Sequence, residues 1–191
     1  MKRLVFAIGT LALAAPLAFA ETATWVPDKA HSSVDFSITH MSLSKVRGHF
    51  GNIAGKILWN DADITKSSVE VTIDMSTVDT GVSGRDSDLK SANFFDIAQF
   101  PTATFASTSV AKNGDKLNVT GNLTVHGVTK PVTLEVEGPS GPVTGMDHKP
   151  HAGFSAKTTI NRRDFGIGAK MPAAMLGEDV PLTIDLDIAK Q

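Results

Sequence analysis

One short stretch shows most plainly the pattern that decides the fold: Val69-Glu70-Val71-Thr72-Ile73-Asp74-Met75. Apolar and polar side chains alternate at every position, as they do when successive residues of a strand point to opposite faces of a sheet. The same period recurs in residues 33–39 and 182–188. All three stretches therefore predict strands with one buried face and one face in water.

The rest of the chain supplies further strands and little else. The other candidates are residues 22–26, 46–59, 102–111, 116–125, 132–137 and 153–160. The pair Asn113-Gly114 predicts a tight hairpin between two of them. Because most connections are short, the pattern favours an antiparallel meander, and so many strands leave no exposed edge only if the sheet closes into a barrel.

Three segments interrupt the alternation. Residues 87–95 and 171–176 are expected to be short helical segments, the second ended by Gly177, and each is placed to cover a mouth of the barrel. Residues 138–150, rich in Gly and Pro, are expected to form an exposed loop between strands.

The first twenty residues have the features of a secretory signal peptide. Lys2 and Arg3 precede a short apolar run, and Ala18-Phe19-Ala20 is a small-x-small cleavage site. We therefore expect residues 1–20 to be removed and residues 21–191 to form one soluble, exported domain. The whole chain has a formal net charge of −2 and no cysteine. An acidic balance argues against a nucleic-acid partner, since phosphate binding needs a basic surface.

Catalytic and metal-binding patterns are weak. There is no G-x-S-x-G motif and no cysteine nucleophile. Asp28, His31 and Ser32 are the residue types of a catalytic triad, but side chains three apart in an extended segment do not converge. His148 and His151 lack a third ligand nearby for a metal ion. We therefore expect a protein that is not an enzyme and holds no metal and no cofactor.

The predicted interior is rich in side chains without any polar group. It draws on Phe36, Phe50, Phe94, Phe95, Phe100, Phe105, Phe154, Phe165, Met75, Met171 and Met175, and the chain contains no Tyr. A barrel of eight strands is just wide enough to be filled by side chains or to hold one slender ligand. A strand of about ten residues spans on the order of 33 Å, long enough for an extended lipid chain. Composition alone fits both a filled core and a tunnel.

Arginines near the predicted mouth also have two interpretations. Arg85 could meet a polar head group, or it could form a structural ion pair with Asp86 or Asp96. The cluster Arg162-Arg163-Asp164 has the same two interpretations.

Several blocks together resemble the YceI-like family of exported bacterial lipid-binding proteins. They are residues 28–36 (DKAHSSVDF), Gly48-His49-Phe50 with Gly55, Thr80-Gly81 through Arg85-Asp86, Leu89-Lys90-Ser91, Phe94-Phe95-Asp96, Phe100-Pro101, Phe105, residues 121–132 (GNLTVHGVTKPV) and residues 161–166 (NRRDFG). In order and spacing these blocks extend over nearly the whole predicted mature chain. The chain departs from the family at Asp88, where the family often carries His.

The resemblance implies an eight-stranded antiparallel, lipocalin-like barrel in the periplasm, with an elongated apolar cavity for a polyisoprenoid, a quinone-like lipid or another long-chain amphiphile. It also implies homodimers, and it supplies no catalytic residues. On this basis we expect a lipid carrier or sequestering protein in brief contact with a membrane or a membrane protein. The predicted lining is Phe36, Ile38, Met75, Phe94, Phe95, Phe105, Phe154 and Met171, with Arg85 as the candidate head-group contact. The alternatives are a secreted enzyme acting on a lipid head group and a stress-response barrel with a filled core.

Overall fold

The computed structural model describes residues 22–191, so the predicted signal peptide lies outside the described residues. This part of the chain forms strands joined mostly by tight connections, with one α-helix and three short 3-10 helices. The elements are β1 (Thr22–Pro27), β2 (Ser33–His40), β3 (Ser44–Phe50), β4 (Ile53–Asn60), η1 (Ile64–Lys66), β5 (Ser68–Asp74), η2 (Met75–Thr77), α1 (Ser83–Lys90), β6 (Thr102–Asn113), β7 (Lys116–Val125), β8 (Val128–Thr144), β9 (Pro150–Asn161), η3 (Arg162–Phe165) and β10 (Asp179–Lys190).

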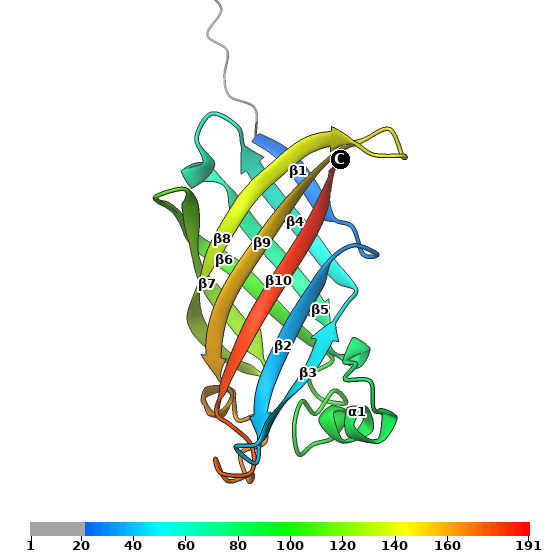
Figure 1. The fold of residues 1–191 in the computed structure, drawn as a ribbon. Helices are drawn as coiled ribbons and strands as arrows, with labels where there is room; N and C mark the ends of the chain where they lie inside the picture. Colours follow the sequence, from blue (N-terminus) through cyan, green and yellow to red (C-terminus); the bar gives the residue numbers. More distant parts are fainter. Residues whose placement is uncertain (1–21) are drawn as a thin grey trace, which may run out of the picture.

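The strands close into an eight-stranded antiparallel barrel, as predicted (Figure 1). Each strand pairs with the next along the sheet from β4 through β10, and β10 pairs with β1, which pairs with β4. β1 and β2 lie end to end along β10 and act as one interrupted strand. β3 and β4 continue each other in the same way beside them.

The alternating stretches become strands close to where the sequence places them. Residues 69–75 correspond to β5, residues 182–188 lie inside β10, and residues 116–125 are β7. The candidate over residues 46–59 is divided into β3 and β4 at Gly51 and Asn52, where Asn52 has a positive φ of 50°. This conformation is unfavourable for most residues and interrupts the strand locally.

The predicted loop over residues 138–150 is wrong. β8 continues to Thr144 and β9 begins at Pro150, so only residues 145–149 lie between the two strands. The pairing survives the Gly and Pro residues because the register shifts between Glu137 and Ser140 and again between Ser140 and Val143.

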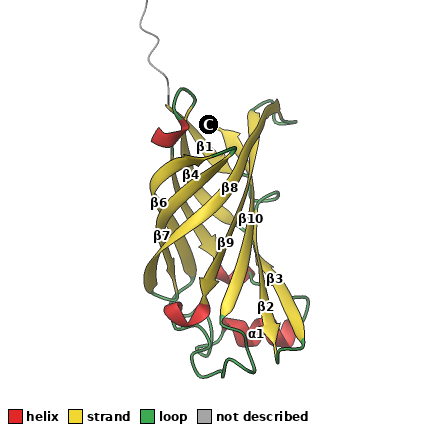
Figure 2. Cartoon of the chain, turned by 60° about the vertical axis from the view of Figure 1, so that its left-hand side comes forward, coloured by secondary structure: helices red, strands yellow, loops and turns green. Residues whose placement is uncertain are grey.

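The two ends of the barrel are built differently. In Figure 1 the β8–β9 connection and the carboxyl terminus lie at the upper end, whereas α1, the β2–β3 turn and residues 161–179 lie at the lower end. Figure 2 shows the helix and long connections gathered at that lower end. The expected helix over residues 87–95 forms earlier, at residues 83–90, and residues 172–176 form a single hydrogen-bonded turn, close to the short helical turn expected there. Both segments cover the lower end.

The buried side chains form two clusters. The smaller one is at the upper end and is centred on Trp25 and Trp59, whose ring centroids lie 5.0 Å apart, with Ile188 fully buried beside them. The larger one extends along the rest of the barrel, from Val110 and Leu117 near the β6–β7 hairpin to Phe165 and Ile167 at the lower end. Within residues 22–191, no helix has both the length and the apolar character that crossing a membrane requires.

Candidate functional site

The lower half of the barrel encloses an apolar cavity of about 290 Å³. It extends from the middle of the barrel to α1 and the turn at residues 172–176. Its lining is Val34, Phe36, Ile38, His40, Val46, Phe50, Ile73, Met75, Arg85, Asp88, Leu89, Phe94, Phe95, Ala103, Leu123, Val125, Ile160, Arg162, Ile167, Met171, Met175, Leu176, Val180 and Leu182. Three of these residues, His40, Asp88 and Met175, are also exposed to solvent. The cavity therefore reaches the surface at the lower end, which we call the mouth.

The structure brings most of the predicted lining residues together in this cavity. Phe36, Ile38, Met75, Phe94, Phe95 and Met171 all line it, and so does Arg85. Phe105 and Phe154 do not. They line a second, smaller cavity of about 80 Å³ in the upper half, below Trp59.

Phe105 lies where one cavity ends and the other begins. On β6, Ala103 lines the lower cavity and Phe105 the upper one. The Phe105 ring lies over Gly121 of β7, so closely that a Cβ at residue 121 would be 2.5 Å from the ring. Glycine is therefore required at this inward-facing position, because any side chain there would displace the ring that separates the two cavities.

Arg85 lies at the mouth and is held by neutral groups. Its Nε donates to Thr80 Oγ1 at 2.7 Å, and one terminal nitrogen donates to the Thr80 carbonyl at 2.8 Å. Asp86 accepts hydrogen bonds from the backbone and hydroxyl of the same threonine. Among residues 22–191, no carboxylate pairs with Arg85, so the predicted ion pair with Asp86 or Asp96 is wrong. The side chain keeps donors and a charge that can face the cavity.

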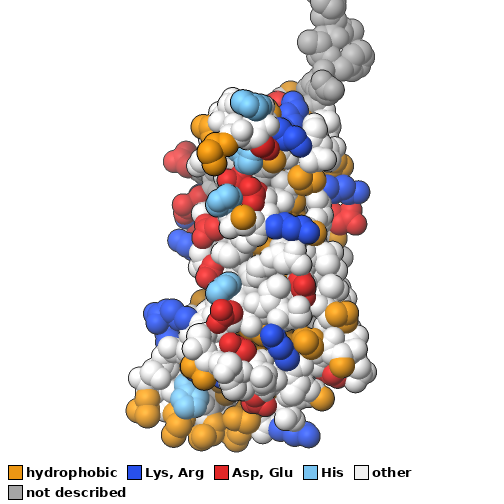
Figure 3. All heavy atoms as spheres, turned by 90° about the vertical axis from the view of Figure 1, so that its right-hand side faces the viewer, with side chains coloured by type: hydrophobic (Ala, Val, Ile, Leu, Met, Phe, Trp, Pro, Cys, Tyr) orange, Lys and Arg blue, Asp and Glu red, His pale blue; other side chains and the backbone are white. Residues whose placement is uncertain are grey.

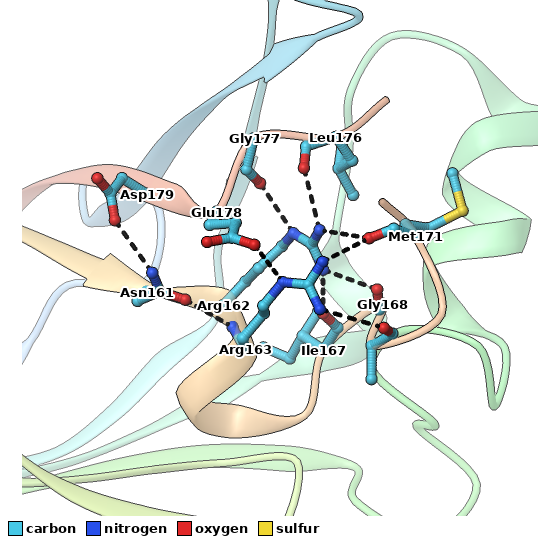
Figure 4. Close-up of polar contacts among 11 residues, drawn as sticks. Asn161, Arg162, Arg163, Ile167, Gly168, Met171, Leu176, Gly177, Glu178 and Asp179 are labelled. Carbon is cyan, nitrogen blue, oxygen red and sulfur yellow. Dashed lines mark hydrogen bonds and ion pairs between the residues drawn. The ribbon is translucent and has the colours of Figure 1, made fainter. Parts of the chain in front are cut away.

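Arg162 is almost completely buried and holds the lower end together (Figure 4). Its Nε donates to the Gly177 carbonyl at 2.8 Å. Its terminal nitrogens donate to the carbonyls of Ile167, Gly168, Met171 and Leu176 over 2.7 to 3.0 Å. All five N–H groups of the guanidinium are used. One side chain thus fastens the whole segment 167–177 across the mouth.

The rest of the arginine cluster faces solvent. Arg163 pairs with Glu178 and donates to the Met171 carbonyl at 3.0 Å.

Desolvation of the buried guanidinium is the main reason that the pKa of Arg162 is lowered from its usual value. Arg162 was predicted either to contact a lipid head group or to form a structural ion pair. Its role is structural, but its partners are backbone carbonyls and not a carboxylate.

The residue types that suggested a triad do not assemble. His31 Nδ1 lies 3.1 Å from Asp28, but the Ser32 hydroxyl donates to the Asp187 carbonyl at 3.1 Å. Ser32 therefore ties the β1–β2 junction to β10. Among residues 22–191, no three His, Cys, Asp or Glu side chains are grouped as a metal ion would need.

His151 takes part in a different arrangement at the upper end. Its two ring nitrogens contact Asp187 at 2.8 Å and Asp147 at 3.2 Å, which fastens the β8–β9 turn to β10. The hydrogen bond to Asp187 is the largest cause that raises the pKa of His151, and Asp147 adds to it. His148 in the same turn is exposed.

Several lining residues were missed by the sequence analysis. They are the aliphatic side chains Val46, Leu123, Val125, Ile160, Val180 and Leu182. Each has the inward parity of its strand, so the alternation that predicted the strands could also have found them. The predicted lining was limited almost entirely to Phe and Met side chains.

Fold and cavity together define a class of protein: a closed antiparallel barrel with an apolar chamber that opens at one end. The YceI-like domain model matches residues 25–188, and the chain belongs to this family. It is 40% identical over 165 residues to Protein YceI of Salmonella newport (strain SL254), covering 84% of this chain and 83% of that one. Protein YceI of Salmonella arizonae is 39% identical with the same coverage.

Solved structures share the barrel. BcnA of Burkholderia cenocepacia superposes with a TM-score of 0.75 and 25% identity, covering 84% of this chain and 98% of that one. The Campylobacter jejuni YCEI protein gives a TM-score of 0.71 and 30% identity, covering 81% and 90%. A polyisoprenoid binding domain from Saccharophagus degradans gives a TM-score of 0.62 at 16% identity, covering 90% and 100%, a likeness of fold.

Proposed function

We propose that the protein is a periplasmic carrier or sequestering protein that holds the tail of a polyisoprenoid or another long-chain amphiphile in the lower cavity. The observation that carries this proposal is the cavity itself: about 290 Å³ of apolar space inside the barrel, open at one end. Burying an apolar tail yields about 25 cal/mol for each Å² removed from water, so such a chamber can bind a lipid without a charged clamp.

Polar groups at the mouth give the ligand its orientation. Arg85, Asp88 and His40 are polar lining residues at this end, whereas the deeper lining is aliphatic and aromatic. An amphiphile would therefore enter tail first and leave its head group beside Arg85, which can donate to a carbonyl, carboxylate or phosphate. Membership of the YceI-like family and the name of the Saccharophagus degradans domain support an isoprenoid cargo. The proposal includes no catalytic step, because Asp28, His31 and Ser32 do not assemble into a triad.

The first experiment is native mass spectrometry of protein recovered from the periplasm without detergent, followed by extraction and identification of any bound molecule. A stoichiometric isoprenoid or quinone supports the carrier proposal and names its cargo. A fatty acid or fatty amide retains the carrier and changes its cargo. An empty protein that also gains no thermal stability from added long-chain lipids would favour the filled-barrel alternative.

A matched pair of substitutions tests whether the lower cavity is the site. Ala103 lies on the cavity side of β6 and Ala106 on the solvent side of the same strand. Ala103→Leu should fill part of the chamber and lower lipid occupancy, while Ala106→Leu should leave occupancy unchanged. Equal occupancy in the two variants would place the lipid elsewhere.

A further inference from the structure

The surface around the mouth carries exposed apolar side chains on two neighbouring loops. Met41 and Leu43 lie in the β2–β3 turn, where they are 44% and 83% exposed, and Met175 in the turn over residues 172–176 is 41% exposed. Pro172, Ala173 and Ala174 beside it are exposed as well. We call these six residues the rim patch. Figure 3 shows hydrophobic side chains gathered at this lower end of the molecule.

The two loops of the rim patch form one surface. The Met41 amide donates to the Met175 carbonyl at 2.9 Å, and the Gly177 amide donates to the Thr39 carbonyl at 2.8 Å. His40 and Leu176 form a β-bridge between the same loops. Since Arg162 fixes the second loop from inside, the exposed apolar side chains are held in place on an ordered support.

The charge around the rim patch is positive in an acidic chain. Residues 40–49 and 165–177 contain Lys45, Arg47 and Lys170 and no Asp or Glu, although the whole chain has a net charge of −2. All three cations are exposed. Asp88, the acidic residue that lines the cavity, belongs to α1, which lies to the right of the β2–β3 turn and residues 161–179 in Figure 1. Glu178, directly after the second loop, is paired with Arg163.

We infer that the rim patch is a docking surface for an anionic phospholipid bilayer, with Leu43, Met41 and Met175 inserted among the acyl chains and the cations at the head groups. Apolar tips surrounded by Lys and Arg are the chemistry by which peripheral proteins bind such membranes. Continuity with the cavity favours this occupant, because Met175 both lines the chamber and belongs to the patch. A tail could then pass from bilayer to barrel without crossing water.

A second copy of the chain fits this surface less well. A two-fold contact through the rim patch would set the same surface of both copies together, and Lys45, Arg47 and Lys170 would meet their own equivalents. Like charges brought together in this way oppose association. A bilayer containing anionic lipid offers the opposite charge.

The test is co-sedimentation of the purified protein with vesicles of phosphatidylcholine, with and without phosphatidylglycerol. We expect binding to the anionic vesicles that weakens at high salt. Leu43→Ser should lower the affinity about tenfold, and Lys45→Gln and Arg47→Gln about fivefold each. Val143→Ser and Met146→Ser are the matched controls, because these side chains are 64% and 102% exposed at the upper end, and both should bind like the unchanged protein.

A fluorescent label gives a second readout. The chain contains no cysteine, so Leu43→Cys and Met146→Cys each create a single site for an environment-sensitive dye. The dye at residue 43 should shift to the blue when anionic vesicles are added, and the dye at residue 146 should not. Equal behaviour of the two sites, or equal vesicle binding by Leu43→Ser and Val143→Ser, would overturn the inference. So would a dimer that Leu43→Ser dissociates and that binds no vesicles.

The docking surface has a biological purpose only if the protein carries a lipid, so this inference rests on the proposed function. Membrane docking and lipid binding are measured by different experiments, so either one can fail without the other. Cargo binding is measured by thermal shift without vesicles, where Leu43→Ser should match the unchanged protein. A protein that docks on vesicles but never takes up a lipid would uphold the docking surface and remove the carrier function.

Discussion

The upper and lower halves of the barrel share most of their strands, but their interiors are packed differently. The upper half keeps only a small cavity of about 80 Å³, because large rings pack there: Trp25 lies against Trp59, and Phe154 meets Trp59 edge to face with centroids 5.8 Å apart. In the lower half, long connections cover the end from outside, and a cavity of about 290 Å³ stays open although phenylalanine and methionine side chains line it. The comparison shows that a barrel can keep a chamber when its end is covered by loops instead of being plugged by core side chains.

The two halves also differ in what stabilises them. The Trp25 cluster depends on apolar burial, with Ile188 fully buried in it. The lower end depends on polar contacts to backbone carbonyls, concentrated on Arg162. A cavity lacks packing partners on one side, so its walls need such support from elsewhere.

The largest expected effect comes from removing that support. Arg162→Met should lower the free energy of unfolding by about 3–5 kcal/mol, because five carbonyls, two of them fully buried, lose their donor. Arg162→Lys should cause a smaller loss of stability than Arg162→Met, because lysine keeps the positive charge but has fewer N–H donors than arginine. Urea unfolding measures both. Arg163→Met is the control, since its ion pair is partly exposed and should contribute no more than about 1 kcal/mol. Equal losses at residues 162 and 163 would contradict this account of the lower end.

A smaller effect is expected at the boundary between the halves. Phe105→Leu should cost about 1–2 kcal/mol of stability and, by shortening the ring over Gly121, connect the two cavities. The variant should then accept longer chains, as measured by thermal shift across lipids of increasing length. Phe100→Leu is the control, because Phe100 packs against His126 and lines neither cavity. An unchanged length preference would mean that Phe105 does not divide the interior.

The smallest effect concerns pH at the upper end. The raised pKa of His151 means that its contribution is fully present below about pH 6.5 and is lost as the pH rises through the raised value. Asp147, whose pKa is lowered mainly by the Lys149 amide, keeps its contribution until the pH falls below about 3.8. Protection factors for amide exchange in residues 145–149, which correct for the intrinsic pH dependence of exchange, should therefore be highest between these limits. His151→Asn should remove the dependence above pH 6.5, and His148→Asn should retain it.

Much of the fold could be predicted from the alternation of apolar and polar residues. Where that prediction failed, the reason is physical. Alternation tells which face of a strand is buried, so β5, β7 and β10 were predicted closely. It cannot tell that β8 continues through Gly138 to Thr144, because register shifts there keep the pairing despite residues typical of turns. Alternation also cannot show that residues 46–59 form two strands, because the break is caused by the positive φ of Asn52.

The candidate site shows the same limit. Alternation placed Phe36 and Phe105 alike on the inner face, but the height of a residue along the barrel axis depends on how neighbouring strands are staggered. Phe36 therefore lines the lower cavity and Phe105 the upper one. The role of Arg162 depends on five carbonyls from a loop without regular structure, and nothing in the local sequence encodes that geometry.

β3 has one uncovered edge, because β5 pairs with β4 and not with β3. Among residues 22–191, the backbone contact along this edge is the bridge between His49 and Asp79. An open strand edge is a template on which another chain can add its own strand, and charged side chains on the edge discourage this. Lys45 and Arg47 are exposed on β3. They therefore also protect the folded protein against edge-to-edge aggregation.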